Sequence, residues 1–272
     1  MLYIGLPQWS HPKWRQWGIT SLEEYARYFN CVEGNTTLYA VPSAETVMRW
    51  RAMSHDDFRF CFKFPATISH QAALRDCASL TQEFLQRMEP LAERVAQYWL
   101  QLPAAFSPRD LPALWAFLGA LPQGFNWGVE VRHPAFFEKG DAERALNQGL
   151  HARGVNRVIL DSRPVHSATA STPAMVEAQR KKPRLPVHAV LTGTMPVVRF
   201  IASDDMPQSA GLFNNWINCL SGWSADHNPF LFLHTPDIGE VHQIVTTLLP
   251  ELQRLAPGFT PPPAQPEQST LF

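Results

Sequence analysis

The chain has 272 residues, 45% of them hydrophobic, and a formal charge of −1. This length and apolar content suit one large domain with a substantial core, and the near-zero charge excludes a global basic field that would recruit nucleic acid or membrane. Neither a membrane-spanning apolar run nor a secretory start occurs, and the four cysteines form no C-x-x-C pair. We therefore expect a cytoplasmic protein with reduced thiols and no membrane contact.

Short apolar runs alternate with longer amphipathic segments along the chain, as in repeated βα units with parallel strands. We count eight such units, with strands expected at Leu2–Gly5, Cys31–Gly34, Phe58–Phe64, Gln97–Gln101, Asn126–Arg132, Asn156–Asp161, Val197–Ala202 and Phe230–His234. Between them we expect a helix opened by Thr20 or Ser21, then helices at Ala44–Met53, Ala78–Glu93, Leu111–Leu121, Asp141–Arg153, Gly211–Ser221 and Gly239–Leu255.

Two segments break this rhythm. Ser162–Val187 is too long for an ordinary connection and contains the basic cluster Arg180-Lys181-Lys182. We interpret it as an insertion after the sixth strand, beside the active face. Pro257–Phe272 is proline-rich and poor in core residues, which predicts a mobile tail after a barrel domain of residues 1–256.

Eight alternating units in this length predict an α/β protein, a single (β/α)₈ TIM-type barrel, with a doubly wound sheet as the alternative. Polar residues at the carboxyl ends of the strands favour a closed barrel. Each lies an even number of positions from a residue expected to face the barrel interior, so both should point to the same side of the strand. The expected interior residues include Cys31, Cys61, Trp99, Gly128, Ile159 and Phe232. We expect the polar residues to converge on one mouth. They are Glu33, Lys63, Gln101, Glu130, Arg132, Asp161, Arg199 and His234.

Six short motifs, taken together, resemble those of one protein family. They are Val32–Tyr39, Phe60–Pro65 with Ile68–His70, Leu100–Pro103, Val129–His133, Leu160-Asp161 and Val198-Arg199. Together they resemble the YecE-like family of TIM barrels, a domain of unknown function, over nearly the whole chain. The resemblance implies a deep polar cleft and no settled reaction. The chain departs from the common family pattern after Arg199, where Phe200-Ile201 replaces Leu-His-Gly, and at Phe232–Thr235, where an Asn pair is frequent.

The acids at the mouth are the predicted catalytic residues. Glu33, Glu130 and Asp161 are expected to supply a general acid and a general base, because crowded carboxylates have their pKa values pushed apart. Lys63, Arg132 and Arg199 would bind a phosphate or carboxylate. A purely structural ion lattice among these residues is the alternative. The other predicted substrate-binding residues are Asn35, Tyr39, His70, Gln101, His133 and His234.

No cofactor is predicted. A divalent metal is kept as an alternative because the acids and histidines include ligand types, although the balance of cations and anions argues against a dedicated centre. His70 and His133 have a structural alternative, which is to cap a loop or orient a carboxylate. The mouth loops also carry aromatic residues that would either stack on a sugar or base or pack the loops: Trp9, Trp14, Trp17 and Tyr39.

The first functional hypothesis is an enzyme with acid/base chemistry on a small anionic substrate that is phosphorylated, sugar-like or a nucleic acid. Hydrolysis or lysis is favoured, including phosphoester cleavage, while isomerisation needs the same residue types and stays open. No nucleophile elbow, phosphate-binding glycine loop or dinucleotide fingerprint occurs in the sequence.

The second hypothesis is a non-catalytic DNA-maintenance accessory. The last five residues resemble the Gln-x-x-Leu-Phe peptide with which bacterial partners bind the DNA sliding clamp: Gln268 would anchor, while Leu271 and Phe272 would fill an apolar pocket. The basic cluster Arg180-Lys181-Lys182 would touch phosphates. The alternative for the tail is that Phe272 docks on its own barrel.

Overall fold

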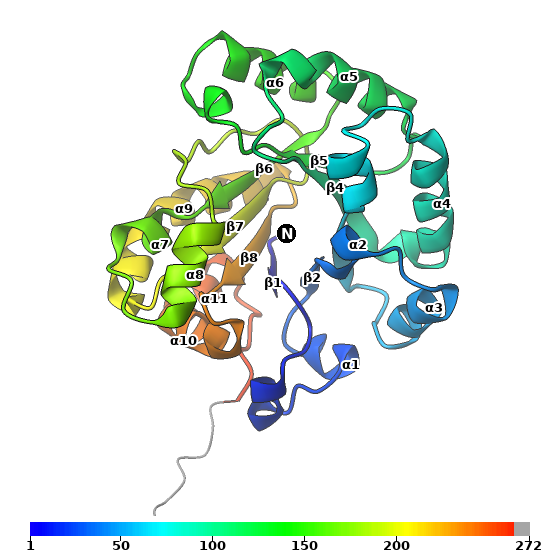
Figure 1. The fold of residues 1–272 in the computed structure, drawn as a ribbon. Helices are drawn as coiled ribbons and strands as arrows, with labels where there is room; N and C mark the ends of the chain where they lie inside the picture. Colours follow the sequence, from blue (N-terminus) through cyan, green and yellow to red (C-terminus); the bar gives the residue numbers. More distant parts are fainter. Residues whose placement is uncertain (264–272) are drawn as a thin grey trace, which may run out of the picture.

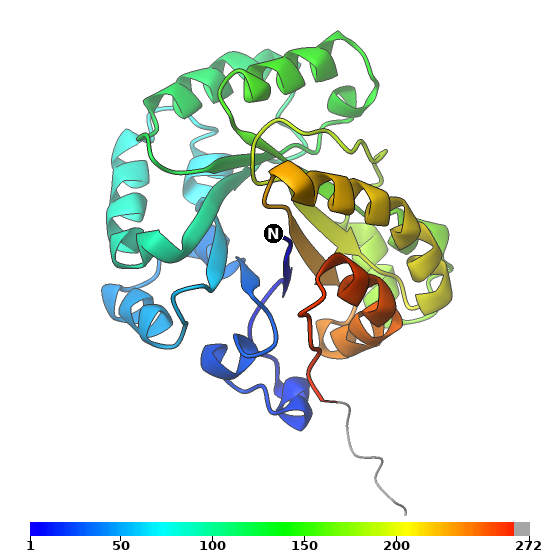
Figure 2. The same cartoon turned by 180° about the vertical axis from the view of Figure 1, so that it is seen from behind.

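A computed structural model describes residues 1–263. Eight parallel strands close a barrel in chain order, with β8 paired to β1, so the predicted fold class is confirmed. Figure 1 shows the strands ringed by helices, with α3 to α6 along one side and α7 to α11 along the other; Figure 2 shows the same ring from behind. The strands are β1 (Tyr3–Leu6), β2 (Cys31–Gly34), β3 (Arg59–Lys63), β4 (Val95–Gln101), β5 (Trp127–Glu130), β6 (Asn156–Asp161), β7 (Val197–Ile201) and β8 (Phe230–His234).

The α-helices are α1 (Leu22–Tyr25), α2 (Thr36–Tyr39), α3 (Ala44–Ala52), α4 (Ala78–Met88), α5 (Leu111–Ala120), α6 (Asp141–His151), α7 (Arg163–Ser167), α8 (Pro173–Lys181), α9 (Met206–Asp226), α10 (Val241–Thr247) and α11 (Leu249–Leu255). Shorter helical turns are η1 (Pro12–Trp17), η2 (Thr67–Gln71), η3 (Glu89–Arg94), η4 (Pro108–Asp110), η5 (Pro134–Phe137) and η6 (Ile238–Glu240).

Prolines and caps account for the differences from the predicted helices. The predicted helix Ala78–Glu93 ends at Met88 because Pro90 opens the turn η3. The predicted helix Gly239–Leu255 is divided into η6, α10 and α11, and Pro250 lies in the first turn of α11. The predicted helix at Gly211–Ser221 is the middle of the longer α9, which begins after Asp205 because this carboxylate accepts from the Gln208 amide at 2.9 Å.

The core has two layers. The outer and larger one lies between the sheet and the helices. The inner one fills the barrel and includes Cys31, Cys61, Trp99, Val158 and Phe232. Strands β1 and β2 pair through Gly5 and Cys31, and the backbones lie too close there for a side chain at Gly5. A Cβ at Gly5 would lie 2.2 Å from the carbonyl oxygen of Cys31, so no side chain fits there. All four cysteines are free.

The predicted inward parity is wrong for β6. Leu160 pairs with Arg199 and Asp161 pairs with Phe200, so Asp161 faces the helices. Its Oδ2 accepts from the Trp216 indole of α9 at 2.8 Å. Val158, rather than Ile159, belongs to the inner core. The apolar run in β6 is buried on both faces, and such a run carries no alternation from which parity can be read.

The insertion after β6 contains α7 and α8, and its end lines the mouth of the barrel as predicted. The described part of the predicted tail contacts the barrel: Phe259 packs near Phe29 with ring centroids 6.0 Å apart. The predicted clamp-binding residues Gln268, Leu271 and Phe272 lie outside the described residues and stay a prediction. No helix within residues 1–263 is long and apolar enough to cross a membrane.

Candidate functional site

A buried ion network closes the floor of the barrel mouth, at the carboxyl ends of the strands. Arg199 of β7 is its centre: Nε and Nη2 donate to the two oxygens of Glu33 on β2 at 2.9 and 2.8 Å, and Nη1 donates to Glu130 on β5 at 2.8 Å. Arg132 donates from Nε and Nη2 to the other oxygen of Glu130 at 2.9 and 2.8 Å. All four oxygens of the two carboxylates therefore accept hydrogen bonds from the two guanidinium groups.

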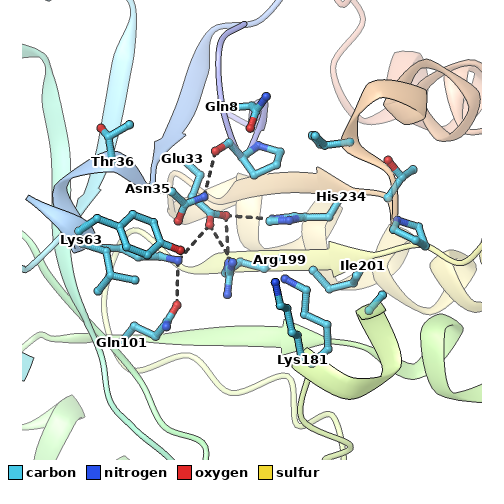
Figure 3. Close-up of a pocket in the computed structure, with 18 of the residues that line it drawn as sticks. Gln8, Glu33, Asn35, Thr36, Lys63, Gln101, Lys181, Arg199, Ile201 and His234 are labelled. Atoms are coloured by element: carbon cyan, nitrogen blue, oxygen red, sulfur yellow. Dashed lines mark hydrogen bonds and ion pairs between the residues drawn. The ribbon is translucent and has the colours of Figure 1, made fainter. Parts of the chain in front are cut away.

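Lys63 and His234 complete the network around Glu33 (Figure 3). The Lys63 Nζ lies 3.3 Å from Glu33 Oε1 and donates to the side-chain oxygen Oε1 of Gln101 at 2.8 Å. The His234 Nε2 lies 3.0 Å from Glu33 Oε2. The predicted convergence on one mouth thus holds for strands β2, β3, β4, β5, β7 and β8.

Both network carboxylates are ionised. Burial by itself would raise the pKa of Glu33, but the charges of Arg199 and Lys63 hold it well below its usual value. Burial is likewise outweighed at Glu130, where Arg199 and Arg132 lower the pKa to about 2. Neither group keeps a proton at neutral pH. The expected division into one general acid and one general base is therefore absent from this pair.

Lys63 is the group whose protonation changes near neutral pH. Burial and the charge of Arg199 lower the pKa of Lys63 to about 7, although Glu33 and Glu130 oppose this. Burial lowers the pKa of His234 to about 4, so its imidazole is neutral and donates from Nε2 to Glu33. When Lys63 and His234 are both neutral, the charges of the two carboxylates and the two guanidinium groups cancel, and burial together with the charge of Arg199 opposes a further proton on Lys63.

This pKa predicts a pH-dependent stability. The unfolded chain holds the Lys63 proton up to about pH 10.4, whereas the folded protein releases it near pH 7. Folding therefore releases a proton between these values, and the contribution of Lys63 to stability rises with pH there by at most about 1.4 kcal/mol per unit. Between pH 7 and 9, the free energy of unfolding of the wild type, measured by urea unfolding, should rise relative to that of Lys63→Met by up to this amount per pH unit. A pH-independent difference would contradict the lowered pKa.

Above the network lies a cavity of about 780 Å³. Basic groups outnumber acids in its lining even when Lys63 is neutral: four (Arg132, Lys181, Lys182 and Arg199) against two (Glu33 and Glu177). Lys181 is paired with Glu177 at 2.6 Å on the surface of α8. Burial and the charge of Arg199 lower the pKa of Lys182 to about 8. The cavity therefore presents a net positive face to an incoming ligand.

The predicted site residues are divided between this cavity and its surroundings. Asn35 lines it and donates to the Pro7 carbonyl at 2.9 Å, and Tyr39 lines its rim with 83% of its surface exposed. The cavity lining also includes Lys63, Gln101, Arg132, Arg199 and His234. Glu130 lies in the network without lining the cavity.

Three predicted site residues join neither the cavity nor the ion network. Asp161 is held outside the barrel by Arg163, whose Nη2 donates to it at 2.6 Å, and by Trp216. The side chain of His133 accepts from the Ala135 amide at 3.2 Å and caps η5, the structural alternative considered for it. His70 bonds to the Ser69 hydroxyl at 2.8 Å; burial and the nearby charges of Arg132 and Lys63 lower its pKa.

The aromatic loop residues are divided in the same way. Trp14 and Trp17 are buried and stack on each other with centroids 5.9 Å apart, so they pack the first loop rather than meet a ligand. Trp9 and Tyr39 line the cavity.

Lys181 and Lys182 are the site residues that the sequence did not assign to the mouth. The signal was present: they lie at the end of α8, within the insertion that follows β6, and a loop after a barrel strand starts at the mouth. Within residues 1–263, no three His, Cys, Asp or Glu side chains are grouped so as to hold a metal ion.

The fold and the site define a (β/α)₈ barrel with a charge-balanced ion network beneath a cationic cavity. The chain belongs to the family described as protein of unknown function DUF72, whose model matches residues 3–269. It is 65% identical over 272 residues to UPF0759 protein YecE of Escherichia coli (strain K12) and 64% identical to that of Escherichia coli O157:H7, with full coverage of both chains in each case. The predicted family resemblance is confirmed.

Two solved structures share the fold. A DUF72 family protein of Enterococcus faecalis V583 superposes with a TM-score of 0.67 at 17% identity, covering 92% of this chain and 96% of the other. One of Thermotoga maritima MSB8 gives a TM-score of 0.65 at 17% identity, covering 94% and 99%.

Proposed function

We propose that the protein is an enzyme that binds a small phosphorylated or carboxylated substrate in the mouth cavity and transfers a proton through Lys63. The observation that carries this proposal is the position of Lys63. It is a buried amine in the cavity wall beside the ionised Glu33, and the same lining contains Arg132, Lys182 and Arg199. A purely structural lattice would need no amine that changes its charge near neutral pH.

The side chains that line the mouth cavity would bind the phosphate or carboxylate group of the substrate. Arg132 donates to Glu130 from Nε and Nη2, and no described residue accepts from its Nη1, so this donor is available to a ligand. Lys182 adds a second basic group to the lining. A phosphate or carboxylate would bring the negative charge that the cavity lacks.

The type of proton transfer follows from the charge state of the groups. Hydrolysis by a carboxylate pair requires one protonated acid, and both Glu33 and Glu130 have lowered pKa values. A neutral amine removes a proton from carbon or oxygen, which suits a lyase or isomerase better than a hydrolase. Among the reactions that the sequence leaves open, we therefore favour those that begin with proton abstraction.

The basic cluster of the insertion supports the enzyme over the DNA accessory. Arg180 and Lys181 both lie within ion-pair distance of Glu177, at 3.3 and 2.6 Å. Lys181 and Lys182 line the mouth cavity. The cluster is therefore partly neutralised and directed to the cavity, which is a poor arrangement for binding a long nucleic acid.

Solvent exchange tests the proposed enzyme without knowledge of the full reaction. In heavy water, the protein should replace a carbon-bound proton by deuterium in at least one member of a panel of small phosphorylated and carboxylated aldehydes, ketones and hydroxy acids, followed by proton NMR. Lys63→Met should slow this exchange by about 100-fold or more, because it removes the proposed base.

The two lysine controls separate binding from proton transfer. Lys182→Met should raise the half-saturating substrate concentration about tenfold by removing a charge-assisted contact. Lys139→Met, at an exposed lysine that does not line the cavity, should match wild type. Exchange that is absent throughout the panel, or that persists in Lys63→Met, would refute the proposal.

A further inference from the structure

We propose that Lys63 is a nucleophile that forms an imine with the carbonyl carbon of an anionic aldehyde or ketone bound in the mouth cavity. This inference rests on the proposed function and deepens it, because it names the substrate class: a small carbonyl compound that carries a phosphate or carboxylate. The imine would acidify the neighbouring C–H bond, so proton exchange would still depend on Lys63, although its nitrogen would then be bound to the substrate and no longer be the free base.

The hydrogen bonds of Lys63 orient its reactive electron pair. A neutral amine has two N–H donors and one lone pair. Among residues 1–263, Nζ donates a hydrogen bond to Gln101 Oε1 at 2.8 Å and lies at ion-pair distance, 3.3 Å, from a second possible acceptor, Glu33 Oε1. Figure 3 shows both contacts on Lys63 at the wall of the cavity. When both protons point to these acceptors, the lone pair has no partner in the described protein and is left for a ligand.

The floor of the cavity prevents Lys63 from moving away. Its Nζ lies 5.4 Å from the centroid of the Trp99 ring, and both side chains are buried. The Thr37 hydroxyl donates to the Lys63 backbone carbonyl at 2.7 Å and fixes the end of β3. A long side chain that is usually mobile is thus held in one orientation, as a nucleophile requires.

The surrounding groups suit each stage of imine formation. The Nζ lone pair attacks the carbonyl carbon and forms a C–N bond while the C=O π bond breaks. Glu33 is ionised and lies 3.3 Å from Nζ, so it would take the two amine protons, one after the other, and pass them to the former carbonyl oxygen, which leaves as water. Arg132 and Lys182 would hold the anionic group of the substrate during these steps.

Reductive trapping tests the covalent step. The intact protein is incubated with pyruvate or dihydroxyacetone phosphate and sodium borohydride, which adds hydride to the imine carbon and leaves a stable secondary amine. Mass spectrometry should find one adduct per chain, located by peptide mapping at Lys63. Labelling should be more than about tenfold faster there than at exposed Lys139, since an ordinary lysine keeps its proton to about pH 10.4. Sulfate should slow labelling by competing for the cationic groups.

Gln101→Glu supplies a variant of matched shape. The new carboxylate would stabilise the ammonium form of Lys63, so the pH dependence of trapping should shift to higher pH. A role of Gln101 in folding alone would not move the pH profile.

Each outcome of trapping is decisive. An adduct at Lys63 with the sulfate effect and the shifted profile supports the inference. Adducts spread over surface lysines or the N-terminus overturn it. Absence of an adduct from either probe, with deuterium exchange that still depends on Lys63, also overturns it and leaves the proposed function standing. Loss of both exchange and trapping refutes the two together.

Discussion

Replacing Arg199 by Met should destabilise the protein by about 3–5 kcal/mol, because it leaves Glu33 and Glu130 buried with part of their positive partner removed. Arg199 makes three of the hydrogen bonds to these carboxylates and is itself buried. The variant should also raise the pKa of both acids and of Lys63, since the Arg199 charge lowers all three. Urea unfolding at neutral pH measures the loss.

Two further variants test the reason for this loss. The double variant Glu33→Gln/Arg199→Met removes the pair together and should lose about 1–3 kcal/mol less than the sum of its single variants. Arg144→Met is the surface control, because Arg144 pairs with Asp141 where the side chains are 60% and 98% exposed. It should remain within about 0.5 kcal/mol of wild type. A similarly small change for Arg199→Met would show that the network contributes little to stability.

Replacing Gly5 by Ala should cost about 3 kcal/mol or more, at the upper end of overpacking effects. The added Cβ would lie 2.2 Å from the Cys31 carbonyl oxygen and 2.8 Å from the Cys31 sulfur. The first of these atoms is backbone in a paired strand, so no change of rotamer relieves the contact. Strands β1 and β2 must separate, and thermal unfolding should show a large fall in melting temperature.

Gly119→Ala in α5 is the matched control for the same substitution. Gly119 lies inside a helix, and a Cβ there meets no atom within 4 Å. Alanine should stabilise the helix by about 0.5–1 kcal/mol. If Gly5→Ala melts at the same temperature as wild type, the close approach of the two strands is not a constraint in solution.

The fold was predictable because each βα unit carries its own pattern. Strands β2, β6 and β8 have the predicted bounds, and a closed barrel follows from eight such units. Helix ends were less predictable, since Pro90 and Pro250 divide helical patterns that read as continuous. Whether a proline ends a helix or starts a new one depends on the packing around it.

The site was predictable in its location and less so in its contacts. Glu33 and Arg199 meet across 166 residues because strand ends converge in a barrel, a rule that needs only the strand assignment. The prediction for Asp161 was wrong because a strand that is buried on both faces has no alternation of polar and apolar residues to show which side chains face inward. The lowered pKa of Lys63 depends on its burial and on the charges of residues from different strands, and no local motif encodes either.

The bonds between Arg199 and Glu33 also limit how such a barrel can be rearranged by recombination. Glu33 lies in the half made of β1 to β4, and Arg199 lies in the half made of β5 to β8. A half-barrel inherited from another ancestor would bring a new partner to a buried charge, and a mismatch would leave that charge uncompensated. We therefore expect substitutions at Glu33 and Arg199 to be coupled, although β2 and β7 are not neighbouring strands in the barrel.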